Sequence, residues 1–283
     1  MSQRNPYIYA VFLLVLLLPN IALSGTTEKI IFLHHSTGAG VYNYPDKGVA
    51  TWFDEYNATN ETSYVISERG YPTGSYPWNN YPYDYWNLWI NGVCDSNEST
   101  TECMTTLTQN HDVIIYKHCY PGAAIQADTG SPDVSSSRKS LENYKLQYRA
   151  LLAMMDSYPD TKFIVWTLAP LHRLATSETT AARAAEFVDW VKTDFLTEDG
   201  NPHPNIFIFD FWGHVAETNP TPTQGETNCL KYDYERSHSS NDSHPNSAAN
   251  NAVGPQFAQF IVNTAQSKEQ VTCLEPTIML LFE

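Results

Sequence analysis

Basic residues are scarce in this chain. Lysine and arginine together number 16, against 31 aspartate and glutamate residues, which gives a formal net charge of −15 in 283 residues. Proteins that bind nucleic acid use lysine and arginine to displace phosphate counterions, and no basic patch is evident in the sequence. The composition therefore predicts no nucleic-acid partner and disfavours a polyanionic substrate.

The chain also has little hydrophobic sequence that could span a membrane. The apolar stretch at residues 9–18 holds about ten residues, against roughly 20 in a spanning helix, and Pro19 comes directly after it. Arg4 precedes this stretch and small residues come after it, as in a secretory signal peptide. We expect residues 1–24 to be a cleaved signal peptide rather than a membrane anchor, and the mature protein to be secreted or periplasmic, with no membrane contact after cleavage.

The five cysteines cannot all pair with one another. Disulfide bonds form and persist in exported proteins. Cys94 and Cys103 bracket a short polar loop, and Cys229 could reach Cys273, so we expect these two pairs, although spacing alone does not fix the connectivity. Cys119 then remains, and its place after an apolar run indicates a buried thiol rather than a nucleophile.

Short apolar runs alternate with helical patterns along the chain. With 42% hydrophobic and 17% charged residues, the chain can bury one sizeable core, so residues 25–283 are expected to form one domain. The alternation is typical of parallel strands connected by helices. The predicted strands, rich in β-branched and aromatic residues, are 29–33, 64–66, 112–116, 162–166 and 205–209.

Three segments carry apolar residues at helical spacing. Residues 141–155 and 184–195 each place their apolar side chains on one face, which should pack on the sheet. Residues 247–267 repeat the pattern, but Gly254 and Pro255 are expected to break or restart that helix.

Residues 71–89 are crowded with aromatic residues and follow neither period. We expect a long ordered loop there. Its tryptophans, Trp78, Trp86 and Trp89, either cover the sheet edge or form a wall that faces the substrate. Exposed aromatic rings suit the faces of sugars, so the second alternative favours a carbohydrate.

Ser36 follows the first predicted strand, in the sequence His34-His35-Ser36-Thr37-Gly38. Open α/β sheets form their binding crevice at the carboxyl ends of their strands. A serine at the following turn can direct its own backbone N–H at a developing oxyanion, although it can also serve only as a helix cap.

A polar loop before the last predicted helix supplies possible partners for this serine. It places Asp242 two residues before His244. A hydroxyl is a poor nucleophile at neutral pH, so a histidine must take its proton, and a carboxylate or carbonyl must hold that histidine in the required tautomer. The same residue types would also suit a surface turn.

These two stretches carry a resemblance to a known family. "IIFLHHSTG" and "NDSHPN" resemble the first and last blocks of the SGNH or GDSL-type hydrolases, with His34-His35 where many members have Gly-Asp. "FIVWTLAPL", "AARAAEFVDWV" and "DSHPNSAAN" are similar to a bacterial subgroup of that superfamily. The resemblance spans residues 29–267 and implies a three-layer α/β/α, flavodoxin-like fold with a central five-stranded parallel sheet.

The resemblance also implies roles for individual residues. Ser36 would be the nucleophile, His244 the general base and Asp242 the acid that orients it. Family members usually place that acid three residues before the histidine, where this chain has Asn241, so Asn241 is the alternative. The implied activity is hydrolysis of a carboxylic ester, which we take to be a small-molecule or polysaccharide ester, with an acetyl group on a carbohydrate as the first candidate.

The oxyanion hole departs from the family pattern. Gly70, after the second strand, matches the family's glycine donor, but the asparagine expected after the third strand is missing. His118, Tyr120 or a backbone N–H are the possible substitutes. His35 is expected beside the substrate, supporting the serine turn.

We expect no metal and no cofactor. Histidines are good zinc ligands, but neighbours such as His34 and His35 on a strand point to opposite sides, and no zinc-binding helix motif occurs. The main alternative to an enzyme is a non-catalytic carbohydrate-binding or surface interaction protein on the same fold, and a metal-dependent phosphoesterase ranks last. A monomer is expected.

Overall fold

The computed structural model describes residues 27–267 except residue 78. The expected signal peptide lies outside the described residues. Among the helices of the described part, none has both the length and the hydrophobicity that crossing a membrane requires.

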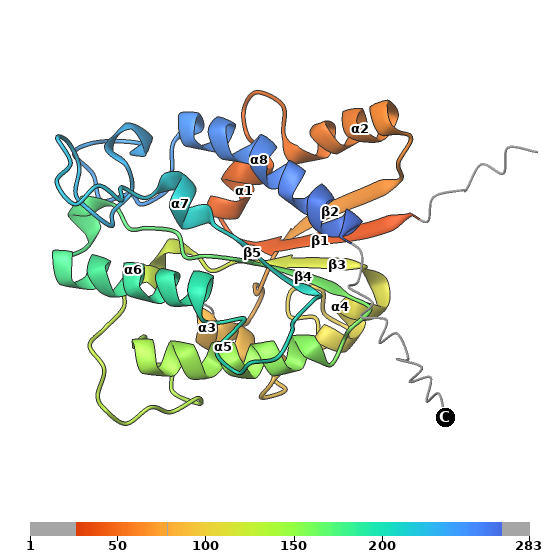
Figure 1. Ribbon diagram of the computed structural model, residues 1–283, viewed down its shortest axis with the longest axis horizontal. Helices are drawn as coiled ribbons and strands as arrows, with labels where there is room; N and C mark the ends of the chain where they lie inside the picture. The colour runs from red at the N-terminus through yellow and green to blue at the C-terminus, as the bar shows by residue number, and fades with distance from the viewer. Residues whose placement is uncertain (1–26, 78, 268–283) are drawn as a thin grey trace, which may run out of the picture.

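A five-stranded sheet forms the centre of the molecule (Figure 1). All neighbouring strands run parallel, in the order β2-β1-β3-β4-β5. The strands are β1 (Glu28–His34), β2 (Tyr64–Gly70), β3 (Val113–Tyr116), β4 (Lys162–Trp166) and β5 (Ile206–Phe209). The five predicted strands and the flavodoxin-like order are thereby confirmed.

Helices cover both faces of this sheet, so the domain has three layers (Figure 1). One face carries α1 (Thr37–Tyr42), α2 (Val49–Asn60), α7 (Phe211–Val215) and α8 (Ser247–Gln266), and the other carries α3 (Pro82–Trp89), α4 (Met104–Asn110), α5 (Leu141–Asp156) and α6 (Glu178–Thr193). Alternate β1 side chains enter the two cores: Ile31 and Leu33 face α3 and α5, while Ile30 and Phe32 face α8. Three short 3-10 helices complete the described elements: Tyr120–Ala123, Arg173–Ala175 and Tyr232–Tyr234.

The last helix differs from the prediction, because α8 runs through Gly254 and Pro255 without a break. Proline inside a helix costs about 3 kcal/mol, but Val253 and Phe257 on either side are buried in the core and offset that cost. Glycine is needed at position 254, since an added Cβ would overlap the ring of Tyr44.

The aromatic segment 71–89 also differs from the prediction, because its last eight residues form helix α3 rather than a loop. Pro82 begins this helix, and Asp84 Oδ2 accepts a hydrogen bond from the backbone N–H of Tyr81, so the usual signals of a helix start were present. Tyr85 is fully buried, and Trp86 and Trp89 are each 8% exposed. The rings of Tyr85 and Trp89 pack on Tyr116 of β3, so they cover the sheet rather than face a substrate, while Trp78 lies outside the described residues.

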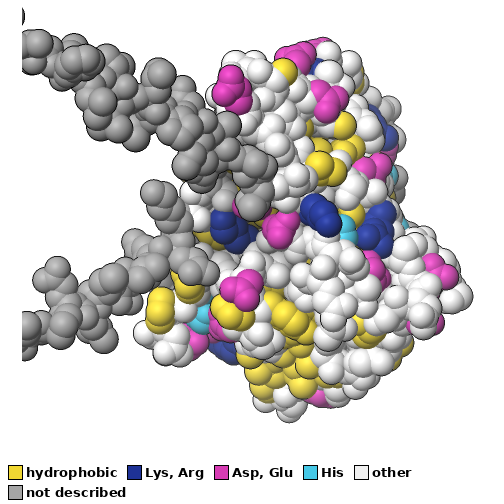
Figure 2. Space-filling model, turned by 90° about the vertical axis from the view of Figure 1, so that its right-hand side faces the viewer, with side chains coloured by type: hydrophobic (Ala, Val, Ile, Leu, Met, Phe, Trp, Pro, Cys, Tyr) yellow, Lys and Arg dark blue, Asp and Glu magenta, His cyan; other side chains and the backbone are white. Residues whose placement is uncertain are grey.

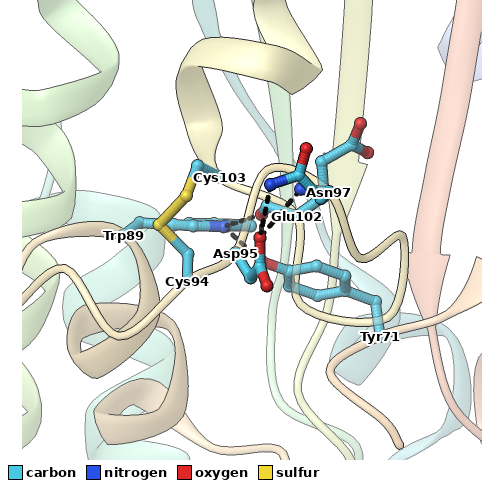
Figure 3. The surroundings of a disulfide bond; sticks show 7 residues. All are labelled: Tyr71, Trp89, Cys94, Asp95, Asn97, Glu102 and Cys103. Carbon is cyan, nitrogen blue, oxygen red and sulfur yellow. Dashed lines mark hydrogen bonds between the residues drawn. A yellow bond between two sulfur atoms is a disulfide. The ribbon is translucent and has the colours of Figure 1, made fainter.

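A disulfide bond joins Cys94 to Cys103. Figure 3 shows it beside the Trp89 indole, whose N–H points toward the hydroxyl of Tyr71 and the backbone of Glu102. The predicted Cys94–Cys103 pair is therefore confirmed. Cys119 and Cys229 are buried, and Cys273, the expected partner of Cys229, lies outside the described residues.

Much of the scarce positive charge is paired with carboxylates. Arg69 contacts Glu102 at 2.8 Å, and Arg149 contacts Glu198 at 2.6 Å. Figure 2 views the end of the molecule at which β1 begins and shows basic side chains dispersed among acidic ones. On the part of this face that the described residues form, basic and acidic side chains thus lie side by side.

Candidate active site

The backbone at Ser36 is strained. β1 ends at His34 and α1 begins at Thr37, so Ser36 forms the turn between them, with φ of 24° in the region that favours glycine. Non-glycine residues in this region cost about 1–3 kcal/mol and occur often at functional sites. Ser36 is nevertheless exposed, so the turn presents its side chain at the carboxyl end of the sheet.

Tight packing beneath the turn holds this conformation. A Cβ atom added at Gly38 would lie 2.5 Å from His34 Cβ and 2.9 Å from Lys117 Cδ. Only glycine allows the first turn of α1 to approach these side chains so closely. The chain therefore fixes Ser36 by packing as well as by its connection to β1.

A cysteine and a lysine lie beside Ser36. The Oγ atom of Ser36 is 3.5 Å from Cys119 Sγ, and Lys117 Nζ is 3.4 Å from the same sulfur. Both residues follow β3, which neighbours β1 in the sheet. The sequence predicted that Cys119 is buried, which is confirmed at 2% exposure, but not that it contacts Ser36.

His244 is paired with Asp242. The distance from His244 Nδ1 to Asp242 Oδ1 is 2.5 Å, and the same oxygen accepts a hydrogen bond from the His244 backbone N–H. Burial opposes ionisation of Asp242, but these hydrogen bonds outweigh it and lower the pKa of that carboxyl. The carboxylate thus holds the proton on Nδ1 and leaves Nε2 free to accept another. Asp242, and not the exposed Asn241, contacts the imidazole.

The segment after β3 links Ser36 to His244. Cys119 contacts Ser36, and the next residue, Tyr120, meets the His244 ring edge to face with 4.9 Å between ring centres. The two stretches of sequence are therefore brought to the same edge of the sheet. Among the described residues, Ser36 Oγ contacts Cys119 and makes no hydrogen bond to His244. Catalytic hydrogen bonds are often long without substrate and tighten when it binds.

A buried carboxylate braces the loop that carries His244. The Glu235 side chain is fully buried and contacts His172 Nε2 at 3.1 Å, Arg173 Nε at 3.0 Å and His238 Nδ1 at 2.9 Å. The backbone N–H of His172 also donates to Ser243 Oγ, next to His244 in the chain. Sequence reasoning missed this network because nothing in a sequence distinguishes a buried glutamate from an exposed one.

His34 and His35 point to different partners, as predicted for neighbours on a strand. His34 Nε2 lies 2.8 Å from Glu68 Oε2, and His35 Nε2 lies 2.5 Å from the carbonyl oxygen of Pro72. Burial lowers the pKa of His34 to about 3. Gly70 pairs with His34 across the sheet and lies against the His35 ring. Gly70 and His35 therefore both lie near the Ser36 turn.

His118 lies in the core rather than at the substrate-facing position expected for it. Its side chain is fully buried, with the rings of Tyr85, Tyr116 and Tyr148 packed around it. Burial, together with the nearby Lys117, lowers the pKa of His118 to about 3. The ring is therefore neutral at physiological pH, and its position gives no support to a role as oxyanion donor.

This buried histidine predicts acid sensitivity. His118 has a pKa of about 6.5 in the unfolded chain and about 3 in the folded protein. The unfolded state therefore binds a proton that the folded state does not, and the free energy of unfolding falls as the pH drops from about 6.5 to about 3. The free energy of unfolding, measured by urea denaturation, should fall between pH 7.5 and pH 4 in both proteins. We expect this fall to be about 3 kcal/mol smaller in His118→Leu than in the wild type.

His203 provides a control of opposite sign. Burial opposes its protonation, but contacts with Asp156 and Asp199 outweigh this and raise the pKa of His203. Protonated His203 stabilises the folded state fully below pH 6.5, and this contribution is lost as the pH rises through the raised pKa. His203→Gln should therefore lower the free energy of unfolding most at low pH. A parallel acid response in His118→Leu and wild type would contradict the prediction.

No metal centre is evident at the site. Within residues 27–267, leaving out residue 78, there is no group of three or more histidine, cysteine, aspartate or glutamate side chains arranged to hold a metal ion.

Comparisons with known proteins concern the fold. No family model matches the chain, and no curated protein matches its sequence. Among solved structures, the acetyl xylan esterase AlAXEase is 16% identical, with 82% of this chain and 99% of that chain covered and a TM-score of 0.48. LAE5, an α/β hydrolase enzyme from the metagenome of Lake Arreo in Spain, is 12% identical over 86% of this chain and 97% of its own, with a TM-score of 0.44. A family 2 carbohydrate esterase from Corynascus thermopiles (Myceliophthora fergusii) is 14% identical over 85% and 67%, with a TM-score of 0.40.

Proposed function

We propose that the protein is a secreted serine hydrolase that cleaves carboxylic esters through an acyl-enzyme intermediate. The observation that carries this proposal is the pairing of Asp242 with His244 at the sheet edge where the strained turn exposes Ser36. An imidazole oriented by a carboxylate is the arrangement that activates a hydroxyl for acyl transfer. The resemblance of both stretches to the SGNH hydrolases agrees with it.

In the first half of the reaction, Ser36 Oγ attacks the ester carbonyl carbon while its proton passes to His244 Nε2. The carbonyl electron pair moves to oxygen, which forms the tetrahedral oxyanion. When this collapses, the bond to the alcohol oxygen breaks, and His244 returns its proton to the leaving alkoxide. Water then attacks the acyl-enzyme by the same route and releases the acid.

Backbone N–H groups are the proposed donors to the oxyanion. The N–H of Ser36 precedes the first turn of α1, and Gly70 ends β2 beside His35. Pre-oriented donors at such a position typically contribute about 10²–10³ in rate each. His35, held on the carbonyl of Pro72, supports the same turn.

An acetyl ester of a carbohydrate remains the first substrate to test. The tryptophans and Tyr85 of α3 are buried, so these rings are not available to bind a sugar and do not support a carbohydrate substrate. What supports it is the expected export of the enzyme together with the open position of Ser36.

Covalent labelling tests the proposal directly. A fluorophosphonate probe should phosphonylate Ser36, because the activated Oγ attacks its phosphorus and displaces fluoride while His244 takes the hydroxyl proton. Peptide mass spectrometry should locate the adduct on the Ser36 peptide. Protein that is denatured in urea before the probe is added should not be labelled. An intact protein that resists the probe, yet is retained on a column of immobilised glycan, would instead indicate a non-catalytic binding protein.

A further inference from the structure

Lys117 is a buried amine that the proposed acyl transfer does not use. It follows β3 directly and is 1% exposed. In the part of the chain that the structure describes, no carboxylate pairs with it; its amine donates to the carbonyl oxygen of His35 at 3.2 Å and contacts Cys119 Sγ at 3.4 Å. An amine buried without a counter-ion costs stability, so such a group marks a candidate functional position.

The carbonyl that Lys117 contacts belongs to a particular peptide group. The carbonyl of His35 and the N–H of Ser36 are the two ends of one peptide unit, and that N–H is the first proposed donor to the oxyanion. A hydrogen bond to the carbonyl end polarises the unit and makes its N–H a stronger donor. The backbone N–H of Gly38 also donates to this carbonyl, at 2.8 Å, so the peptide is held from two sides.

The lysine stem is fixed along with its amine. Gly38 packs directly against this stem, since a Cβ added there would lie 2.9 Å from Lys117 Cδ. Cys119 fills the space between Lys117 Nζ and Ser36 Oγ, which directs the amine to the peptide rather than to the nucleophile itself.

We propose that Lys117 is a positioning residue that acts through the His35–Ser36 peptide and strengthens the oxyanion hole, in place of the asparagine donor this chain lacks. The inference rests on the proposed function and deepens it. Negative charge appears on the substrate oxygen only in the transition state, so the polarised N–H lowers the barrier more than it strengthens substrate binding.

The test compares two variants of the full-length protein with ester turnover as readout. Lys117→Met keeps the volume of the side chain and removes the donor, and we expect kcat to fall roughly 10- to 100-fold with KM changed less than about threefold. Lys117→Gln keeps a donor without charge and should give an intermediate kcat. If the methionine variant does not fold, the glutamine variant alone decides, through its kcat relative to wild type.

A second readout separates this role from a structural one. An alkyl boronic acid forms a tetrahedral adduct with a serine hydroxyl and places a negative oxygen in the hole, so its inhibition constant should rise in Lys117→Met by the same factor by which kcat/KM falls. The matched control is Lys139→Met, because Lys139 also donates to a backbone carbonyl, that of Pro121 at 3.0 Å, and the Pro121–Gly122 peptide is not one of the proposed oxyanion donors. It should keep wild-type kinetics.

The outcomes distinguish the two proposals. Wild-type kcat in a folded Lys117 variant, or an equal loss in Lys139→Met, would overturn the role of Lys117 and leave the serine hydrolase intact. Full turnover in a variant without the Ser36 hydroxyl would overturn the proposed function itself.

Discussion

Replacing Ser36 by alanine is expected to lower ester turnover by about 10⁴-fold or more, since removal of the nucleophile leaves only binding and the oxyanion hole. The assay is hydrolysis of p-nitrophenyl acetate, followed by acetate release from an acetylated xylan. Ser36 is exposed and its hydroxyl contacts only Cys119 among the described residues, so the fold should survive. Circular dichroism and the melting temperature check this.

Two further variants make that result specific. Ser239→Ala removes another exposed hydroxyl, from the loop before His244, and should leave turnover unchanged. Cys119→Ser examines the neighbouring sulfur. If Ser36→Ala retained activity while Cys119→Ser lost it, the nucleophile would be the cysteine and the assignment of Ser36 would be wrong.

The change Asp242→Asn should reduce kcat by roughly 10⁴-fold with little change in KM. The carboxylate accepts the proton of His244 Nδ1 at 2.5 Å and keeps Nε2 available as a base. An amide can instead donate to Nδ1, which favours the wrong tautomer and removes the charge that stabilises the imidazolium. Steady-state kinetics at pH 7 to 8 measure the effect.

Asp233→Asn is the matched control for this substitution. Asp233 is an exposed carboxylate in the 3-10 helix Tyr232–Tyr234, so the same chemical change there should leave kcat near wild type. Asn241→Ala separates the two candidates for the orienting residue, and it should retain most activity because Asn241 does not contact the imidazole. A large loss in Asn241→Ala with a small one in Asp242→Asn would reverse the assignment.

The sheet could be predicted because each strand is a continuous apolar run with a strong local signal. Residues 30–33 and 163–166 illustrate this: their side chains are buried on both faces, as the absence of alternation indicates. Helix α3 could not be predicted in this way. Its apolar residues are large aromatic rings among asparagines and prolines, which obscure the helical period. The start signals at Pro82 and Asp84 were visible but lay within a segment already interpreted as a loop.

The candidate site was predictable where its residues flank regular elements. Ser36 follows β1 and His244 precedes α8, and both positions can be found by counting elements along the chain. Glu235 and Lys117 could not be found this way. Their burial depends on contacts with residues 62 and 82 positions away in the sequence, such as Arg173 and His35, and a charged residue in isolation predicts a solvated surface.

The proposed nucleophile and the proposed base are held by different kinds of structure. Ser36 is attached to the central sheet, whereas His244 belongs to a long irregular stretch between α7 and α8 that depends on the buried Glu235 for its shape. Irregular segments open at lower free energy than core strands. Heating should therefore separate base from nucleophile while the sheet is still intact, so catalysis would cease at a temperature where the far-ultraviolet spectrum is still that of the folded protein.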